Sequence, residues 1–204
     1  TERAPIQGGV TDDSITGTTG KTTVTSLTGQ LVARAGKTVK VAGNIGPTLL
    51  DTLRESMEAE LPEVWVLELS SFQLESAGPF EPSAATVLNI SQDHLDWHGD
   101  MQAYVNAKAN IFGRDTICIL NRDDSLVMNL LTDEQKSNKS VITFGASRPD
   151  EQGAFGIEHD LRAGGIDWLV WAEIDEDLEP QPKRRRKATI VEDEPLRLKR
   201  LIPA

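Results

Sequence analysis

Two glycines, a lysine and several threonines form a short polar run near the start of the sequence. The run comprises Gly17, Thr18, Thr19, Gly20, Lys21, Thr22 and Thr23. Glycines let backbone N–H groups approach phosphate oxygens closely, and the start of a helix behind them favours an anion. Lys21 would neutralise phosphate charge, and the Thr22 hydroxyl would bind Mg²⁺. The run therefore predicts a phosphate-binding loop, the alternative being a plain helix cap with a solvated lysine.

The residues before this loop match such a site less well. Ile15 stands five positions before Gly20, where the common phosphate-loop motif has glycine. Residues 8–14 are mostly small or polar and make a poor candidate for the strand that should present the loop. We therefore expect residues 1–15 to be a poorly patterned leader.

A carboxylate and an imidazole follow two apolar segments that are typical of buried strands. Glu68 follows residues 64–67, and His94 lies in a polar run after the segment that ends at Leu88. Ligand sites in open α/β sheets lie at the carboxyl ends of strands. Glu68 and His94 would there suit a divalent metal bound to phosphate oxygens. Taken singly, each is equally compatible with an ordinary surface or loop position.

Lys108 shares one face of a predicted helix with Tyr104 and Ile111. It is either a lysine that extends from an apolar stripe to solvent, or a buried amine whose lowered pKa leaves it neutral and nucleophilic. The residues alone leave both alternatives open. Serine hydrolase chemistry is excluded at Ser70 and Ser71, because the glycines of a nucleophile elbow are missing there.

Short apolar segments alternate with helical patterns along the first two thirds of the chain. This alternation predicts an α/β fold, a mostly parallel sheet flanked by helices. The predicted strands are 38–41, 64–67, 86–88, 116–120 and 141–144, and the predicted helices are 21–36, 47–57, 100–112 and 126–131. On the first helix, the expected inner face comprises Val24, Leu27, Leu31 and Ala35.

The sequence changes character after residue 144. Residues 155–158 and 168–171 flank a small-residue turn at 163–165 and predict an antiparallel hairpin. Residues 173–179 are acidic and residues 183–187 are basic, which indicates a solvated loop or, alternatively, a contact with anions. We expect a parallel core at 16–144, followed by a β appendage with a charged tail at 145–204.

Composition excludes several classes of protein. The 204 residues include 21 Lys and Arg against 32 Asp and Glu, giving a net charge of −11, which argues against a nucleic-acid binder. The single cysteine excludes an internal disulfide and a cysteine-built zinc site. No apolar run is long enough for a membrane span, and no secretory leader opens the sequence. A cytoplasmic protein is the expectation.

Five motifs occur here in the order and approximate spacing of the Mur ligases, the ATP-dependent amide-forming enzymes of peptidoglycan assembly. The motifs lie at residues 16–23, 43–46, 68–74, 89–96 and 104–108. The sequence ELSSFQL at 68–74 resembles the family member that adds D-glutamate. The resemblance is strong over residues 16–144 and weaker beyond them. Thr19 departs from the family pattern, which usually has Asn or Ser at that position.

The resemblance implies a role for each matching residue. The loop at 17–23 would hold ATP, with Lys21 on the transferred phosphoryl group. Thr22 and Glu68 would bind one Mg²⁺, and Glu68 with His94 would help to hold a second. Lys108 matches a carbamylated lysine that helps to position this second metal. The residues that match the site of the UDP-linked substrate are Asn44, Ser70, Gln73 and His94.

The resemblance also implies the reaction. The family phosphorylates a substrate carboxylate with ATP, and an amine then displaces phosphate from the acyl phosphate. The substrates here would be UDP-N-acetylmuramoyl-L-alanine and D-glutamate. The chain has no room for the family's flanking domains, so we expect a central ATPase domain that does not complete ligation alone. The alternatives are another Mur or folylpolyglutamate-type ligase, and a non-catalytic nucleotide-binding module.

Overall fold

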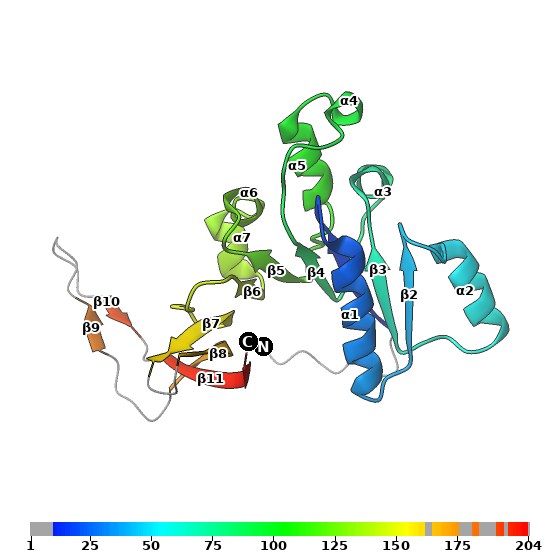
Figure 1. Cartoon of the computed structure of the whole chain (residues 1–204). Coiled ribbons are helices and arrows are strands. Elements are labelled where there is room, and N and C mark those ends of the chain that lie inside the picture. Colours follow the sequence, from blue (N-terminus) through cyan, green and yellow to red (C-terminus); the bar gives the residue numbers. More distant parts are fainter. Residues whose placement is uncertain (1–9, 162–164, 176–180, 184–190, 194–195, 204) are drawn as a thin grey trace. The chain divides into compact units, whose positions relative to one another are not determined.

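The computed structural model describes residues 10–161, 165–175, 181–183, 191–193 and 196–203 (Figure 1). The chain divides into two compact units, residues 1–141 and 142–204. The division falls three residues before the predicted end of the parallel core. Residues 1–9 of the expected leader, most of the hairpin turn, and most of the acidic and basic runs lie outside the described residues.

Unit 1 contains a five-stranded parallel sheet in the order β5-β4-β1-β3-β2. Its strands are β1 (Thr11–Thr16), β2 (Val39–Gly43), β3 (Val64–Glu68), β4 (Ala84–Val87) and β5 (Ile117–Asn121). The chain runs from β3 across β1 to reach β4, so the strand order reverses beside β1. Ligand sites form at such reversals, outside the carboxyl ends of the strands. The predicted α/β fold is confirmed.

Strand β1 corrects the expectation of a poorly patterned leader through residue 15. It pairs with β3 from Thr11 opposite Val64 and with β4 up to Thr16 opposite Val87. Its side chains are mostly polar, but Ser14 and Thr16 are small enough to be buried within the sheet. Pairing on both sides therefore defines a strand that carries almost no apolar pattern.

Seven helices are described in unit 1, and their ends follow the expected capping chemistry. They are α1 (Lys21–Arg34), α2 (Leu49–Glu58), α3 (Ser71–Ser76), α4 (Leu95–His98), α5 (Met101–Ala109), α6 (Ser125–Met128) and α7 (Asp133–Asn138). Asp100 caps α5 by accepting a hydrogen bond from the Ala103 amide. Thr48 caps α2, so Pro47 precedes that helix instead of lying in its first turn.

The inner face of α1 differs from the prediction. Thr25 and Gly29 are buried, whereas Leu27 and Leu31 are 51% and 64% exposed. The physical reason is close packing, because a Cβ atom at Gly29 would lie only 2.4 Å from Cγ2 of Val41 on β2. The small residues therefore face the sheet and the leucines face outward.

Apolar side chains pack on both faces of the unit 1 sheet. The larger cluster includes Leu67, Val87, Tyr104 and Ile111, and it joins β3 and β4 to α5. The smaller cluster is formed by Ile15, Val64 and Val66, with partly buried side chains from α1 and β2 packed against it. These two clusters hold α1 and α5 beside the strands whose ends carry the predicted site.

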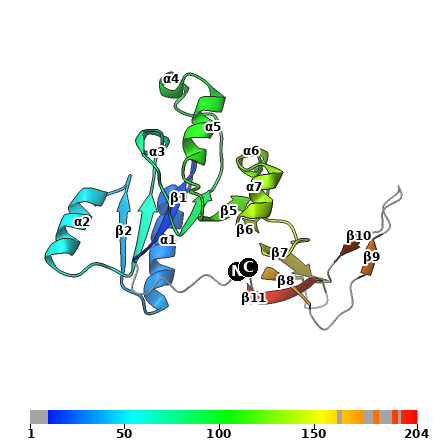
Figure 2. The same ribbon diagram turned by 180° about the vertical axis from the view of Figure 1, so that it is seen from behind.

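Unit 2 is built from strands (Figure 2). They are β7 (Ala154–Asp160), β8 (Ile166–Ile174), β9 (Gln181–Lys183), β10 (Val191–Asp193) and β11 (Leu196–Pro203), and β6 (Val141–Phe144) begins at the end of unit 1. Strand β6 is parallel to β7, whereas the β7–β8 and β8–β11 pairs are antiparallel. The predicted hairpin is confirmed as β7 and β8. None of the described helices is long and apolar enough to cross a membrane.

Candidate functional site

The predicted phosphate loop connects β1 to α1. Gly20 caps α1 with φ of 79°, a left-handed conformation that glycine adopts without a Cβ penalty. Lys21 is the first residue of α1, and its Nζ donates to the Thr18 carbonyl at 3.1 Å. The loop thus lies at the N-terminus of a fourteen-residue helix, where backbone N–H groups and the helix dipole favour an anion.

Asn89, just beyond the end of β4, holds the loop in shape. Its Oδ1 accepts hydrogen bonds from the amides of Thr18 (3.1 Å) and Thr19 (2.9 Å), and its Nδ2 donates to the Thr19 carbonyl (3.1 Å). The residue pattern alone predicts no role for Asn89. A signal was present, because Asn89 is a polar residue that directly follows an apolar strand at the sheet edge where Glu68 lies.

Glu68 brings three elements together at the end of β3. Glu68 is 1% exposed, its Oε2 accepts from the Thr22 hydroxyl of α1 at 2.9 Å, and its Oε1 accepts from Asn44 Nδ2 at 3.0 Å. Within the described part of the chain, no basic side chain lies within ion-pair distance of Glu68. A buried carboxylate needs a compensating positive charge, and carboxylate and hydroxyl oxygens suit Mg²⁺.

Lys108 lies in the interior and does not extend to solvent. It is 2% exposed, and its Nζ donates to the Gly17 carbonyl at 2.8 Å and to Thr16 Oγ1 at 3.3 Å. Burial, and to a smaller extent the positive charge of Lys21, together lower the pKa of Lys108 to about 8. The structure therefore supports a buried amine, whose neutral fraction near pH 7 is larger than that of an ordinary lysine.

His94 lies at the start of α4 in a left-handed conformation with φ of 52°. Its half-exposed ring packs 4.8 Å from the Phe72 ring and 6.4 Å from the Tyr104 ring, measured between centroids. The Tyr104 hydroxyl lies 3.1 Å from Thr18 Oγ1 in the loop. His94 is thus connected to the phosphate loop through Tyr104, and the contacts described for it do not include Glu68.

Ser70 and Gln73 form the capping box of α3. Gln73 Oε1 accepts from the Ser70 amide at 2.9 Å and from its hydroxyl at 3.0 Å, while the Gln73 amide donates to Ser70 Oγ at 3.3 Å. Gln73 is exposed and Ser70 is partly buried, and both follow Glu68 in the sequence just beyond the end of β3. The capping role is visible, and the substrate role stays a prediction.

A metal at this site would depend on oxygen atoms from a ligand. The described residues contain no group of three or more His, Cys, Asp or Glu side chains placed to hold a metal ion. Glu68 and Thr22 supply two protein oxygens at one point, so phosphate oxygens or water would have to complete the coordination. The donors fit a magnesium ion that arrives with a phosphorylated ligand.

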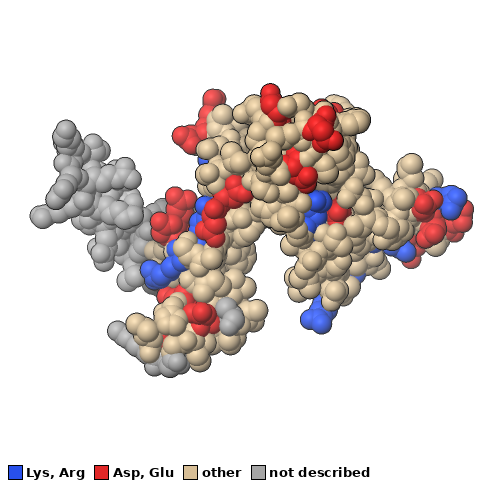
Figure 3. Space-filling view, turned by 45° about the horizontal axis from the view of Figure 1, so that its top comes forward, with Lys and Arg blue, Asp and Glu red and all other residues tan. Residues whose placement is uncertain are grey.

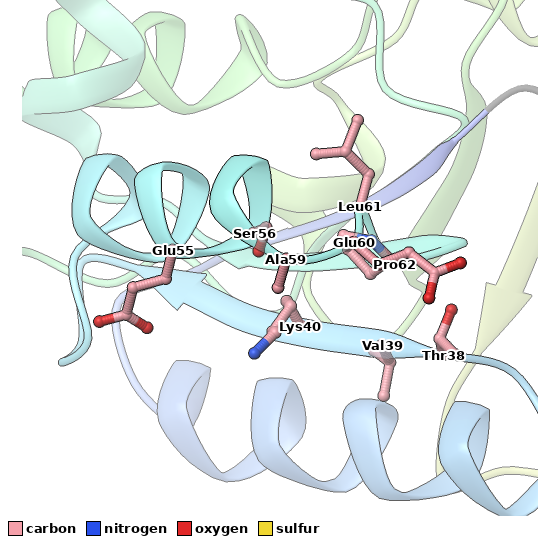
Figure 4. Close-up of a pocket in the computed structure, with 9 residues that line it drawn as sticks. All are labelled: Thr38, Val39, Lys40, Glu55, Ser56, Ala59, Glu60, Leu61 and Pro62. Atoms are coloured by element: carbon pink, nitrogen blue, oxygen red, sulfur yellow. The ribbon is translucent and has the colours of Figure 1, made fainter.

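A pocket of about 250 Å³ lies elsewhere in unit 1, between α2 and the first half of β2 (Figure 4). Its lining includes Thr38, Lys40, Glu55 and Ser56, and none of the predicted site residues. On the face shown in Figure 3, Lys and Arg side chains of the described residues are scattered among Asp and Glu side chains.

The sequence matches the Mur ligase middle domain over residues 15–175. The chain belongs to the Mur ligase family. This Mur ligase chain is 55% identical over 193 residues to the UDP-N-acetylmuramoylalanine–D-glutamate ligase of Paraburkholderia xenovorans strain LB400, covering 94% of the chain and 38% of that relative. It is 57% identical over 198 residues to the ligase of the same name from Polaromonas sp. strain JS666, covering 93% and 32%. The chain thus spans less than two fifths of the length of these relatives.

Solved Mur ligases share the fold. A UDP-N-acetylmuramoyl-L-alanyl-D-glutamate–2,6-diaminopimelate ligase superposes with a TM-score of 0.62 at 25% identity, over 79% of this Mur ligase chain and 37% of the other. A MurF ligase from Thermotoga maritima, solved in complex with ADP, has a TM-score of 0.51 at 18% identity over 80% and 38% of the two chains. Both likenesses agree with the mostly parallel sheet described above.

Proposed function

We propose that this chain is the ATP-binding middle domain of a ligase that joins D-glutamate to UDP-N-acetylmuramoyl-L-alanine. One observation carries the proposal: the buried Glu68 carboxylate meets the Thr22 hydroxyl directly behind a glycine loop at a helix N-terminus. The names of the relatives that are more than 50% identical support the choice of substrates. Because ATP is a cytoplasmic substrate, the proposed reaction takes place in the cytoplasm.

Different residues of the chain have different proposed roles in binding ATP and Mg²⁺. Residues 17–23 surround the phosphates, and Lys21 offsets the charge of the transferred γ-phosphoryl group. Thr22 and Glu68 would hold one Mg²⁺, and Glu68 with His94 would contribute to a second. Bound Mg²⁺ would neutralise phosphate charge, which reduces the repulsion between the phosphoryl group and an anionic carboxylate.

Lys108 is the proposed site of carbamylation. A neutral amine attacks CO₂, an N–C bond forms and one proton is released, which leaves an anionic carbamate. The lowered pKa supports this step, because a larger fraction of the Lys108 amine is neutral near pH 7 than for an ordinary lysine. The anionic product would replace a buried cation with a metal ligand beside the loop.

The acceptor site is proposed for Asn44, Ser70, Gln73 and His94, which lie at or just beyond the carboxyl ends of β2, β3 and β4. There the substrate carboxylate attacks the γ-phosphorus and ADP leaves. The D-glutamate amine then attacks the acyl carbon, phosphate leaves and the amine loses a proton. The flanking domains of the longer relatives would supply the remaining contacts to both substrates.

Titration calorimetry with Mg²⁺-ATP tests the nucleotide site. We expect Lys21→Ala to weaken binding at least about tenfold, because a charge-assisted contact to phosphate is lost. Lys37→Ala is the matched control, because Lys37 forms an exposed ion pair with Glu63 outside the site. Equal affinity of the wild type and the Lys21→Ala variant would overturn the phosphate-loop assignment. A screen of amine acceptors on a longer chain with the flanking domains would separate D-glutamate addition from another ligase activity.

A further inference from the structure

Helix α4 is a single turn, yet it carries His94 at its start (Figure 1). A helix of four residues has too few internal hydrogen bonds to be stable alone. Its position, and that of the His94 ring, must therefore be fixed by contacts with neighbouring elements. The buried side chain of His98, the last residue of α4, makes such contacts on two sides.

Towards α3, His98 combines a hydrogen bond with ring stacking. Its side chain is fully buried, and its Nε2 lies 3.0 Å from the Ser71 hydroxyl. Its Nδ1 lies 3.6 Å from Glu75 Oε2. Its ring stacks on Phe72 with 5.6 Å between centroids and 8° between planes. Three residues of α3 thus hold one imidazole.

Towards α5, the His98 ring packs against Tyr104 at 5.4 Å between centroids. Tyr104 is also the residue that connects His94 to the loop hydroxyl of Thr18. The two histidines therefore share two aromatic neighbours, since each of them contacts both Phe72 and Tyr104. A displacement of the His98 ring would alter the packing that holds the His94 ring.

Other residues attach α4 less firmly. Trp97 contacts the same helix α3, through a hydrogen bond from Nε1 to Glu75 and an edge contact with Phe72, but it is 67% exposed. Leu95 is only partly buried against the core. Buried contacts are not weakened by competing water, so the hydrogen bond of His98 contributes more to holding the helix than the exposed bond of Trp97.

We propose that His98 is a positioning residue: it fastens α4 to α3 and α5 and thereby fixes the His94 imidazole beside Tyr104 and the phosphate loop. The inference rests on the proposed function in one respect, because the importance of the His94 position depends on the proposed role of His94. The geometric part stands on the contacts described above and is testable without turnover.

The sequence makes this test unusually direct, because the chain contains three histidines, namely His94, His98 and His159. Histidine labelled with ¹³C and ¹⁵N gives three ring signals, which single substitutions assign. In the wild-type 204-residue chain we expect the His94 ring signal to be displaced by the ring currents of Phe72 and Tyr104. In His98→Ala, the His94 signal should move towards its value in an unstructured peptide.

Two further variants separate positioning from general destabilisation. His98→Gln keeps an amide in reach of the Ser71 hydroxyl and should restore part of the shift. Ser71→Ala removes only the hydrogen-bond partner of His98, and it should also displace the His94 signal. If His98→Ala fails to fold, Ser71→Ala tests whether His98 positions His94. His159→Gln is the matched control, because this exposed histidine pairs with Asp167 in unit 2.

An unchanged His94 signal in a folded His98→Ala chain, or in Ser71→Ala if the first variant is unfolded, would overturn the inference. Failure of the proposed function gives a different result, namely Mg²⁺-ATP affinity that is the same with and without the Lys21 side chain. The two results are independent, because the Lys21 contact to Thr18 and the Glu68 contact to Thr22 do not involve α4.

Discussion

At the scale of single residues, the site consists of buried charged groups whose partners lie on other elements. Glu68 meets Thr22 and Asn44 through hydrogen bonds, and Lys108 meets the backbone of the loop at Gly17. Asn89 fixes the loop amides through hydrogen bonds to Thr18 and Thr19. A loop whose shape is already fixed loses less conformational entropy when it binds an anion.

The lowered pKa of Lys108 predicts a specific dependence of stability on pH. The folded pKa of about 8 lies below the ordinary value of 10.5, so the unfolded chain binds more protons between these values. The contribution of Lys108 to the free energy of unfolding therefore rises with pH in this window, and the cost of its charge is fully present below about pH 8.

Denaturant unfolding of the wild type and Lys108→Met checks this dependence. We expect the wild type to gain about 2 kcal/mol relative to the variant between about pH 7 and about pH 9.5, since one pKa unit corresponds to about 1.4 kcal/mol. The loss of the hydrogen bonds to Gly17 and Thr16 lowers the free energy of unfolding of the variant by the same amount at every pH. A difference that stays constant over this range would show that Lys108 titrates normally.

At the scale of the elements, the contact between α1 and β2 sets how closely the loop-bearing helix approaches the sheet. Gly29 lets the helix backbone lie against Val41, whose branched side chain has little freedom to move away. The same close approach accounts for the outward orientation of Leu27 and Leu31. The position of Thr22 opposite Glu68 thus depends on Gly29, which has no proposed contact with a ligand.

Gly29→Ala should destabilise the protein although alanine favours helices. The helix gains about 1 kcal/mol from the substitution, but overpacking against Val41 costs about 1–3 kcal/mol. We expect a net loss of up to about 2 kcal/mol in urea unfolding. In a Val41→Ala background the clash is relieved, so the same substitution should there be neutral or stabilising. A stabilising effect in the wild-type background would contradict the close packing.

The sequence reveals the strands that carry branched apolar residues and, through them, the edge where the site forms. Residues 64–67 predict β3 and therefore the place of Glu68. Strand β1 is not predicted, because its Thr, Asp and Ser residues carry no apolar period and its pairing partners are distant in sequence. The inner face of α1 is misassigned because Gly29 gains its importance only from the contact with Val41.

The candidate site, like the fold, is only partly predictable from the sequence. Residue types and strand ends predict that Glu68, Lys21 and His94 gather at one edge. They do not predict that Asn89 holds the loop, or that Lys108 is buried against Gly17. Both contacts join segments at least 70 residues apart, and only tertiary packing determines which atoms meet.

At the scale of the whole molecule, the predicted site residues all fall within unit 1, between Gly17 and Lys108. Unit 2 contributes a mixed set of strands and none of the predicted ligands. The two compact units therefore separate the proposed chemistry from the β appendage. This separation makes the contribution of each unit to nucleotide binding measurable.

A fragment of residues 1–144 should bind Mg²⁺-ATP as tightly as the 204-residue chain, within about twofold, because it retains every proposed ATP contact. Calorimetry on both chains measures this, and circular dichroism establishes that the fragment is folded. The Lys21→Ala variant of the fragment serves as the control for specific binding. Loss of affinity in a folded fragment would mean that unit 2 takes part in the site.

The place of β1 in the middle of the unit 1 sheet has a consequence for how the protein is made. The strand leaves the ribosome well before its neighbours at residues 64–68 and 84–87 are synthesised. Pairing over such separations is slow, and unpaired strand edges are prone to aggregate. During synthesis, the phosphate loop at residues 17–23 therefore lacks its supporting strands until the residues through Lys108 have left the ribosome. Slowing translation before that point should lower the yield of native protein.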